Sequence, residues 1–154
     1  MSWPDNWIAR LDGSECSLCA EGRPENPARG PRIYAGARCD AYLARSGTQP
    51  GWATVIWRGG HVTEPTDLSE DDSVEFWREV LTVGRAMQTH FQAFKMNYSI
   101  LGNRTPHLHA IIAVRFEDDV AAGEPIPASE KSVFPRADVA RDAEALKRLL
   151  SSPD

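Results

Sequence analysis

The spacing of apolar residues changes several times along the chain, and each spacing predicts a different element. Between residues 32 and 44 the apolar residues favour two short strands, interrupted near Gly36. Residues 52–57 predict a third strand, because the segment is rich in β-branched and aromatic side chains. The polar segment 46–51 that lies between these strands predicts a turn.

A long amphipathic helix is predicted to begin after Ser69. Serine is a favoured N-cap residue, and the residues that follow it are acidic, which suits the positive end of a helix dipole. Apolar side chains then recur at helical spacing: Trp77, Val80, Leu81, Met87 and Phe91. We expect this apolar face to pack on a sheet.

The second half of the chain predicts two more strands and a terminal helix. The strands are expected at residues 97–101 and 107–116, joined by a turn at residues 102–104. An acidic, proline-rich segment runs to Pro127, and residues 138–150 predict the helix. Its apolar positions are Val139, Leu146, Leu149 and Leu150. The predicted fold is therefore α+β, with a long helix packed on an antiparallel sheet of about five strands.

Length and composition indicate one globular domain. The chain has 154 residues, of which 42% are hydrophobic and 25% are charged. We divide it into an N-terminal arm (residues 1–31), a core (32–116) and a C-terminal extension (117–154). The arm predicts one short helix from Trp7 to Leu11 and contributes little apolar core, so a cross-link is needed to hold it in place.

Charge and hydropathy exclude several classes of partner. The net charge of −5, without a cluster of Lys and Arg, argues against binding of nucleic acid. No segment approaches the roughly 18 consecutive apolar residues of a membrane helix, and residues 1–10 lack the features of a secretory signal. We therefore expect a cytoplasmic protein with no membrane partner. A small anionic ligand is still compatible, because a few local donors suffice to bind it.

The three cysteines favour a metal site over a disulfide framework. Cys16 and Cys19 are separated by two residues, a spacing that suits either a metal or a redox pair. A redox pair of this spacing is typical of a βαβ unit, which the chain does not predict here. The third cysteine, Cys39, lies among apolar neighbours and is expected to be a buried small side chain.

The two histidines at His107 and His109 form the most informative pattern. On a strand, alternate side chains face the same side, so His107, His109 and Ile111 share one face. The apolar residues between them would face the core. A histidine on a strand is most often a partly buried residue whose hydrogen bonds are made within the protein. This pair therefore indicates a functional site only in combination with features elsewhere in the chain.

In that context the sequence resembles the histidine triad (HIT) superfamily over roughly residues 16–116. The resemblance rests on the order and spacing of several features: His107-Leu108-His109, Tyr98 with Asn103, the strand 51–56, His61-Val62, and Leu68-Ser69 at the start of the long helix. It implies that His109 attacks the α-phosphorus of a nucleotide and forms a nucleotidyl-histidine intermediate. It also implies that backbone N–H groups, Asn103 and Thr105 contact the phosphoryl oxygens, and Arg104 is a further candidate contact that could equally face solvent. Trp52 and Ile111 would then border the substrate.

The same resemblance implies a structural zinc ion. Zinc-containing members of the superfamily pair two cysteines with two histidines, which here are Cys16, Cys19, His61 and His107. Such a site is closed and tetrahedral, so it contributes folding energy and leaves no open position for a catalytic water. We expect zinc to hold the arm against the edge of the sheet and to fix the strand beside His109. The resemblance further implies a homodimer formed through the long helix and a central strand.

Three positions depart from the family pattern. Ile111 replaces the third histidine, Trp52 replaces a histidine on the preceding strand, and Ala44 replaces a ribose-binding aspartate. Isoleucine can neither donate nor accept a proton, so either another group acts as the acid or the leaving group needs none. Two hypotheses follow. The first is a hydrolase or transferase that acts on phosphoramidates, dinucleoside polyphosphates or nucleotide sugars. The second is a catalytically weak protein that binds a nucleotide or another small molecule.

Overall fold

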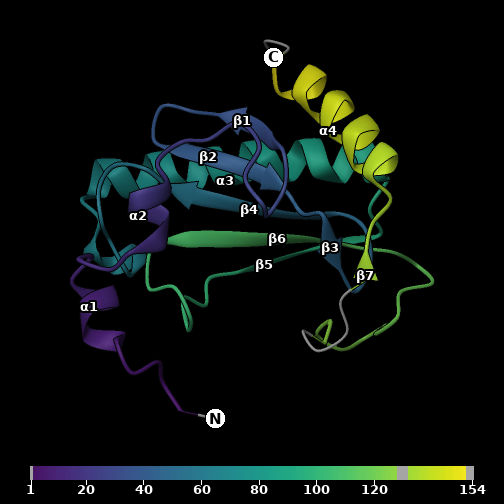
Figure 1. Cartoon of the computed structure of the whole chain (residues 1–154). Helices are drawn as coiled ribbons and strands as arrows, with labels where there is room; N and C mark the ends of the chain where they lie inside the picture. The colour runs from purple at the N-terminus through teal and green to yellow at the C-terminus, as the bar shows by residue number, and fades with distance from the viewer. Residues whose placement is uncertain (1, 128–131, 152–154) are drawn as a thin grey trace.

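A five-stranded antiparallel sheet forms the centre of the computed structural model, which describes residues 2–127 and 132–151. The strand order is β1-β2-β4-β6-β5, and every neighbouring pair is antiparallel. The bounds are β1 Arg32–Ala35, β2 Cys39–Leu43, β4 Trp52–Trp57, β5 Lys95–Ser99 and β6 His109–Arg115. The long helix α3 (Glu70–Phe91) covers one face of this sheet (Figure 1). The predicted α+β fold is confirmed. Residue 1 of the predicted arm, and residues 128–131 and 152–154 of the predicted extension, lie outside the described residues.

The core lies between α3 and the sheet. On β6 the side chains of Ala110, Ile112 and Val114 point to the helix and are fully buried. Phe76 and Val80 of α3 are fully buried against this face. Because side chains alternate along a strand, the intervening residues of β6 lie on the opposite face, which we call the open face.

Helix α3 begins as its sequence predicts. The side chain of Ser69 accepts a hydrogen bond from the backbone N–H of Asp72 at 3.2 Å, and three acidic residues occupy the first turn. Both features stabilise the N-terminus, where backbone donors have no partner within the helix. The helix ends at Gln92, whose φ of 50° is left-handed.

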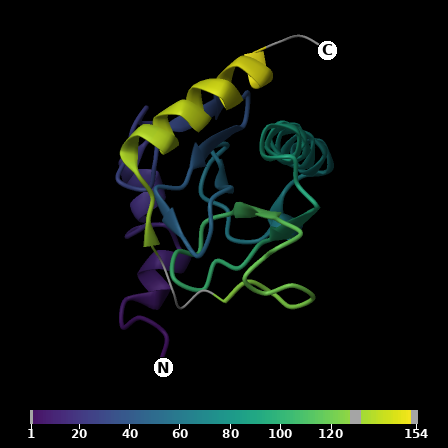
Figure 2. The same cartoon turned by 90° about the vertical axis from the view of Figure 1, so that its right-hand side faces the viewer.

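The terminal helix α4 (Arg136–Ser151) lies across α3 and β1, as the turned view shows (Figure 2). Val139, Ala143 and Leu146 are its buried residues. The prediction that Leu149 belongs to the apolar stripe is wrong, since its side chain is 43% exposed. Val139, Ala143 and Leu146 are separated by four and three residues, so they lie on one face of the helix. Leu149 lies to the side of that face.

The segment 46–51, predicted to be a turn, contains a short strand. β3 (Ser46–Gly47) pairs with β7 (Ser132–Val133), so the extension returns to the connection between β2 and β4 (Figure 1). The N–H of Phe134 donates to the carbonyl of Arg45 at 2.8 Å and continues this contact. The local pattern could not predict the strand, because its partner lies far away in the sequence.

The N-terminal arm contains α1 (Trp7–Leu11), which the sequence predicts, and α2 (Ser17–Glu21). A further single turn, η1 (Pro65–Asp67), precedes α3. Leu18 of α2 belongs to a buried cluster with Cys16, Tyr42 and Ile56. The arm therefore covers the open face of β2 and β4, whereas we expected it at the edge of the sheet. Among the described residues, no helix is long and apolar enough to cross a membrane.

A buried carboxylate joins α3 to the turn between β1 and β2. Glu79 is 2% exposed, and its side chain accepts the backbone N–H groups of Arg38 at 2.8 Å and Cys39 at 2.7 Å. Cys39 is completely buried, as predicted, and burial raises the pKa of its thiol. The buried N–H groups of Arg38 and Cys39 would lose their hydrogen bonds without the Glu79 carboxylate, and a buried donor without an acceptor destabilises the fold.

We predict that Glu79→Ala lowers the free energy of unfolding by about 2–4 kcal/mol, because it leaves two buried N–H groups without an acceptor. Urea denaturation of the purified protein measures this change. Glu79→Gln is the matched control, since it keeps the volume and one acceptor oxygen and should lose less. Equal stability of the alanine variant and the wild type would contradict this role for Glu79.

Candidate functional site

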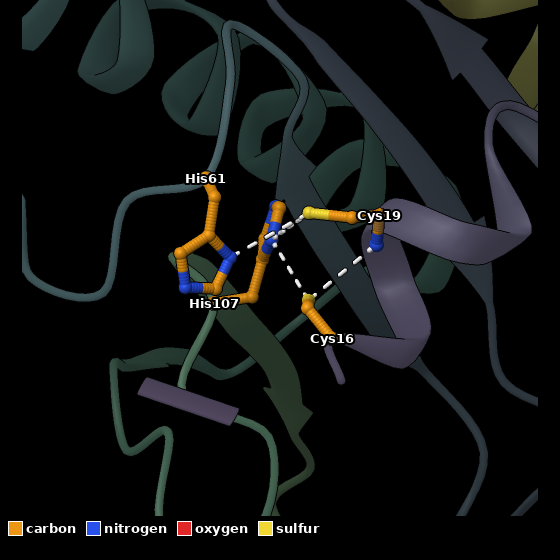
Figure 3. A group of neighbouring side chains, drawn as sticks. All are labelled: Cys16, Cys19, His61 and His107. Carbon is orange, nitrogen blue, oxygen red and sulfur yellow. Dashed lines mark hydrogen bonds between the residues drawn. The ribbon is translucent and has the colours of Figure 1, made fainter. Parts of the chain in front are cut away.

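Four side chains from three separate segments meet at one point. Cys16 and Cys19 come from the start of α2, His61 follows β4, and His107 precedes β6. One ligand atom of each residue lies within 4.8 Å of the ligand atoms of the other three. Figure 3 shows the two sulfur atoms and the imidazoles facing one another. The structure thus brings together all four residues that the sequence predicts as metal ligands.

The distances within this cluster suit a tetrahedral zinc site. Nδ1 of His107 lies 3.4 Å from the sulfur of Cys16 and 3.4 Å from that of Cys19. Nδ1 of His61 lies 3.5 Å from the sulfur of Cys19. Zinc bonds of about 2.3 Å to sulfur and about 2.0 Å to nitrogen, set at tetrahedral angles, separate the two ligand atoms by about 3.5 Å.

Both imidazoles are held in the tautomer that metal binding requires. Nε2 of His107 donates to the carbonyl of Trp57 at 2.7 Å, and Nε2 of His61 donates to the carbonyl of Leu11 at 3.0 Å. A carbonyl oxygen can only accept, so the proton resides on Nε2 and the lone pair of Nδ1 faces the sulfurs. This arrangement of outer hydrogen bonds is typical of histidines that bind zinc.

The electrostatics of the cluster also favour a cation. Burial and the neighbouring Cys16 raise the pKa of the Cys19 thiol to about 11. Burial lowers the pKa of His107, so its ring is neutral. Without a cation the sulfur of Cys19 would stay protonated, whereas a divalent metal ion stabilises its thiolate form. The four residues could hold a zinc ion with no position left for another ligand.

A buried aspartate and its two arginine partners contact the segment that carries the cysteines. Asp40 of β2 is completely buried and lies 2.8 Å from the guanidinium of Arg23 and 3.2 Å from that of Arg58. Arg58 also donates to the carbonyl of Leu18 in α2 at 2.9 Å. The sheet therefore holds α2 in position independently of the cluster itself.

His109 is the first residue of β6, on the open face. Its Nδ1 donates to the carbonyl of His107 at 2.6 Å, which places the proton on Nδ1. Its Nε2 makes no hydrogen bond to any described residue, and the ring is half-buried. In this tautomer of the neutral ring, Nε2 carries the lone pair that can contact a ligand. His107 precedes β6, whereas we expected it within that strand, and the departure lets its ring turn to the cluster.

The turn before His107 carries the three predicted phosphate contacts. Asn103 and Arg104 are exposed and Thr105 is half-buried. The carbonyl of Arg104 accepts a hydrogen bond of 2.7 Å from Arg10 of α1, and the carbonyl of Thr105 accepts from the N–H of His107 at 2.8 Å. The arm thus contacts this turn and also contributes Cys16 and Cys19 to the cluster.

The two remaining predicted residues, Ile111 and Trp52, lie on the open face at different distances from His109. Ile111 follows His109 on the same side of β6, opposite Thr54 and Ser99. Trp52 lies one step further, opposite Ala113. Sequence analysis missed Thr54 and Ser99, although alternation along each strand would have placed their hydroxyls on a common face. The register that sets them beside Ile111 depends on pairing between distant segments.

A comparison of the sequence with models of protein families gives a match. The sequence model described as "HIT domain" matches residues 24–118. A search of curated proteins finds no match.

Solved structures of histidine triad proteins share the fold. One from Bradyrhizobium japonicum is 24% identical, with a TM-score of 0.73, and the match covers 79% of this chain and 91% of that one. One from Marinobacter aquaeolei is 25% identical, with a TM-score of 0.72, covering 80% and 90%. A zinc-bound histidine triad family protein from Mycobacterium smegmatis is 21% identical, with a TM-score of 0.65, covering 90% and 94%.

We predict that the purified protein contains about one zinc ion per chain, and that Cys16→Ser loses the metal. The variant should also melt roughly 10 °C or more below the wild type, because the ion cross-links the arm to the sheet. Elemental analysis and thermal denaturation measure the two effects.

Cys39→Ala is the control for this experiment. It removes the third cysteine, which lies outside the cluster, and should leave the zinc content unchanged. A Cys16→Ser variant that keeps its metal, or a metal-free wild type of undiminished stability, would refute the zinc assignment.

Proposed function

The chain belongs to the HIT domain family, and from this premise we propose that it is a nucleotidyl hydrolase or transferase that acts through His109. One observation carries the proposal. The hydrogen bond of 2.6 Å from Nδ1 of His109 to the carbonyl of His107 fixes the tautomer of the neutral ring, in which Nε2 carries the lone pair on the open face. A neutral imidazole with a fixed tautomer is the form that attacks phosphorus.

In the proposed first step, Nε2 of His109 forms a bond to phosphorus while the bond to the leaving group breaks. The imidazole becomes positively charged, and the carbonyl of His107 stabilises that charge through the existing hydrogen bond. Asn103, Thr105 and backbone N–H groups of the turn supply donors for the phosphoryl oxygens. In the second step, water or another acceptor attacks phosphorus and releases His109.

We assign zinc a structural role in this activity. Cys16, Cys19, His61 and His107 would hold the ion and use all four of its positions. Since His107 also supplies the carbonyl that orients His109, its ligation would restrict the position of the nucleophile. The chemistry that zinc supplies here is fixation of the fold, with no direct contact to the substrate.

The absence of a third histidine restricts the leaving group. Ile111 occupies that position, and the hydroxyls opposite it, on Thr54 and Ser99, are weak acids. An amine leaving group needs a proton, whereas a phosphate leaves as a stable anion. Among the candidate substrates we therefore favour dinucleoside polyphosphates and nucleotide sugars over phosphoramidates.

The second candidate function is binding of a nucleotide or another small molecule without turnover. The observation that favours it is the loss of three polar family positions, at Ile111, Trp52 and Ala44. The two functions differ in whether a covalent bond forms at His109.

We predict that wild-type protein cleaves a member of a panel of dinucleoside polyphosphates, nucleotide sugars and nucleoside phosphoramidates. His109→Ala should lower the rate at least about 100-fold, since no other described side chain offers this nitrogen on the open face. Rapid quenching followed by mass spectrometry should detect a nucleotidyl adduct on His109 of the wild type.

His90→Ala serves as the control. His90 lies on α3 and pairs with Asp142 of α4 at 3.2 Å, so its removal should leave the rate unchanged. If the protein binds a member of the panel but cleaves none of them, the second function is supported and the first is overturned.

We also propose that the chain forms a homodimer through α3 and β5. Val74, Trp77 and Leu81 form an exposed stripe on α3, with side chains 38–55% exposed. The stripe continues at Gly84, on which Tyr98 of the edge strand β5 packs. A second copy would cover this apolar surface and the free edge of β5 together.

Sedimentation of the wild type should therefore give the mass of a dimer, and Leu81→Glu should give a monomer, because it places a charge in the proposed interface. Leu149→Glu is the matched control. Leu149 is a similarly exposed leucine on α4, 43% against 45% for Leu81, and lies outside the stripe. A monomeric wild type, or a dimeric Leu81→Glu variant, would refute this interface.

A further inference from the structure

The four residues of the proposed zinc site differ in their access to water. Cys16 is 5% exposed and His107 is 2% exposed, whereas Cys19 is exposed and His61 is half-buried. Buried structural cysteines are inert, whereas solvent-accessible thiolates react with oxidants. Cys19 is therefore the cysteine of this set that a dissolved oxidant can reach.

We infer that Cys16 and Cys19 form an oxidation site, at which a hydroperoxide such as hydrogen peroxide converts the two thiolates into a disulfide and the metal is lost. The inference goes beyond the proposed activity at His109 and rests on the zinc assignment. In redox sensors the reactive thiol is accessible to solvent and lies beside a second cysteine that resolves the oxidised one. Here Cys19 is the accessible thiol and Cys16 is the buried, resolving thiol.

The backbone places the two sulfurs within reach of one another. Cys16 is the N-cap of α2, and Cys19 is the third residue of that helix. The sulfur of Cys16 accepts the backbone N–H of Cys19 at 3.4 Å, and the two sulfurs lie within 4.8 Å (Figure 3). Helix geometry separates Cα atoms three residues apart by about 5 Å, inside the range of about 4.4–6.8 Å that a disulfide requires. The bond can therefore form with little movement of the backbone.

The third cysteine is kept away from this pair by the sheet. Cys39 is completely buried in the core, on the side of β2 that packs against α3. Cys16 belongs instead to the buried cluster with Tyr42 and Ile56 on the open face. Oxidation within one chain should therefore give a single pairing, Cys16 with Cys19.

The oxidation removes two electrons from the two sulfurs. The thiolate of Cys19 attacks one oxygen of the peroxide, so that a sulfur–oxygen bond forms, the oxygen–oxygen bond breaks and hydroxide leaves. The thiolate of Cys16 then attacks the sulfur of Cys19, which forms the disulfide and expels a second hydroxide. Two protons from solvent convert both hydroxides to water. Because the thiolate is the form that binds metal, only His61 and His107 are then left as ligands.

Contacts outside the cluster hold the cysteine segment in both states. Leu18, between the two cysteines, is 7% exposed and belongs to the buried cluster with Tyr42 and Ile56. Its carbonyl accepts a hydrogen bond of 2.9 Å from Arg58, whose guanidinium also lies 3.2 Å from the buried Asp40. The oxidised segment is therefore retained on the sheet, and a reductant together with zinc should restore the original site.

Loss of the metal affects the rest of the site through the two histidines. Nε2 of His61 donates to the carbonyl of Leu11, and a Cβ atom on Gly13 would lie 2.8 Å from the His61 ring, so the backbone of the arm packs directly against it. His107 supplies the carbonyl that accepts from His109. Without the metal, both rings lose their cross-link to α2, and the arm and the acceptor of His109 are held less firmly.

Peroxide treatment of the zinc-loaded, full-length protein tests the inference. A few equivalents of hydrogen peroxide should release about one zinc ion per chain to a chromogenic chelator. Mass spectrometry of the digested protein should find a disulfide between Cys16 and Cys19, and dithiothreitol with added zinc should reverse both changes. A wild type that keeps its zinc, or a disulfide that forms through Cys39 or between chains, overturns the inference.

Cys19→His is the discriminating variant, because it keeps four ligands and removes the thiol that reacts. Its position is exposed, so the larger ring has room. Under peroxide it should release zinc at least about tenfold more slowly than the wild type. Cys39→Ala keeps the pair and is the control, so it should release zinc as the wild type does. Equal release from Cys19→His and the wild type would overturn the inference, and if the variant binds no zinc, the disulfide mapping of the wild type decides.

The outcomes are independent of the proposed function. Zinc release and disulfide formation are measured without a substrate, so the inference stands or fails whether or not the protein cleaves a nucleotide. If cleavage through His109 is found, its rate should fall in step with zinc release and recover after reduction in the presence of zinc. Full activity of the oxidised, zinc-free protein would overturn the link between the cysteine pair and His109.

Discussion

The contacts of one residue, His107, connect the three parts of the site. Its Nδ1 faces the two cysteine sulfurs, its Nε2 donates to the carbonyl of Trp57, and its own carbonyl accepts from His109. The ring is 2% exposed, so these bonds are shielded from water. Any shift of the cluster of Cys16, Cys19, His61 and His107 therefore moves the acceptor that sets the tautomer of His109. The position of His109, the proposed nucleophile, depends on the anchoring of the arm.

The two faces of the sheet have different roles: one packs against α3, and the other carries His109. The face that meets α3 is filled by side chains such as Ile112 and Val114, and it fixes the register of β6 against β4. That register determines which residues accompany His109 on the open face. A shift by one residue would bury His109 and expose Ile112, so the apolar core enforces the geometry of the polar face.

Short-range patterns were sufficient to predict the central strands and the long helix, and the proposed metal ligands followed from a short-range cysteine spacing combined with the family resemblance. Ser69 with its acidic neighbours located the start of α3, and the Cys16–Cys19 spacing, together with the family resemblance, indicated the cluster. Three features could not be predicted: the β3–β7 pairing, the arm on the open face, and the position of the segment 116–121, which Arg115 holds beside β6. Each depends on contacts between residues far apart in the chain, which leave no periodic signal.

Two buried ion pairs explain how those distant contacts become specific. Asp40 with its arginines fixes the arm to β2, and Arg115 with Asp119 fixes the segment 116–121 beside β6. Replacement of such pairs by apolar residues often costs little stability, because desolvation offsets their attraction. Apolar contacts, however, are not directional and allow one segment to shift along another, whereas charged hydrogen bonds fix the relative orientation of the two segments. The open face thus combines an apolar core beneath it with charged contacts around it, and these contacts set where the arm and the segment 116–121 stand relative to His109.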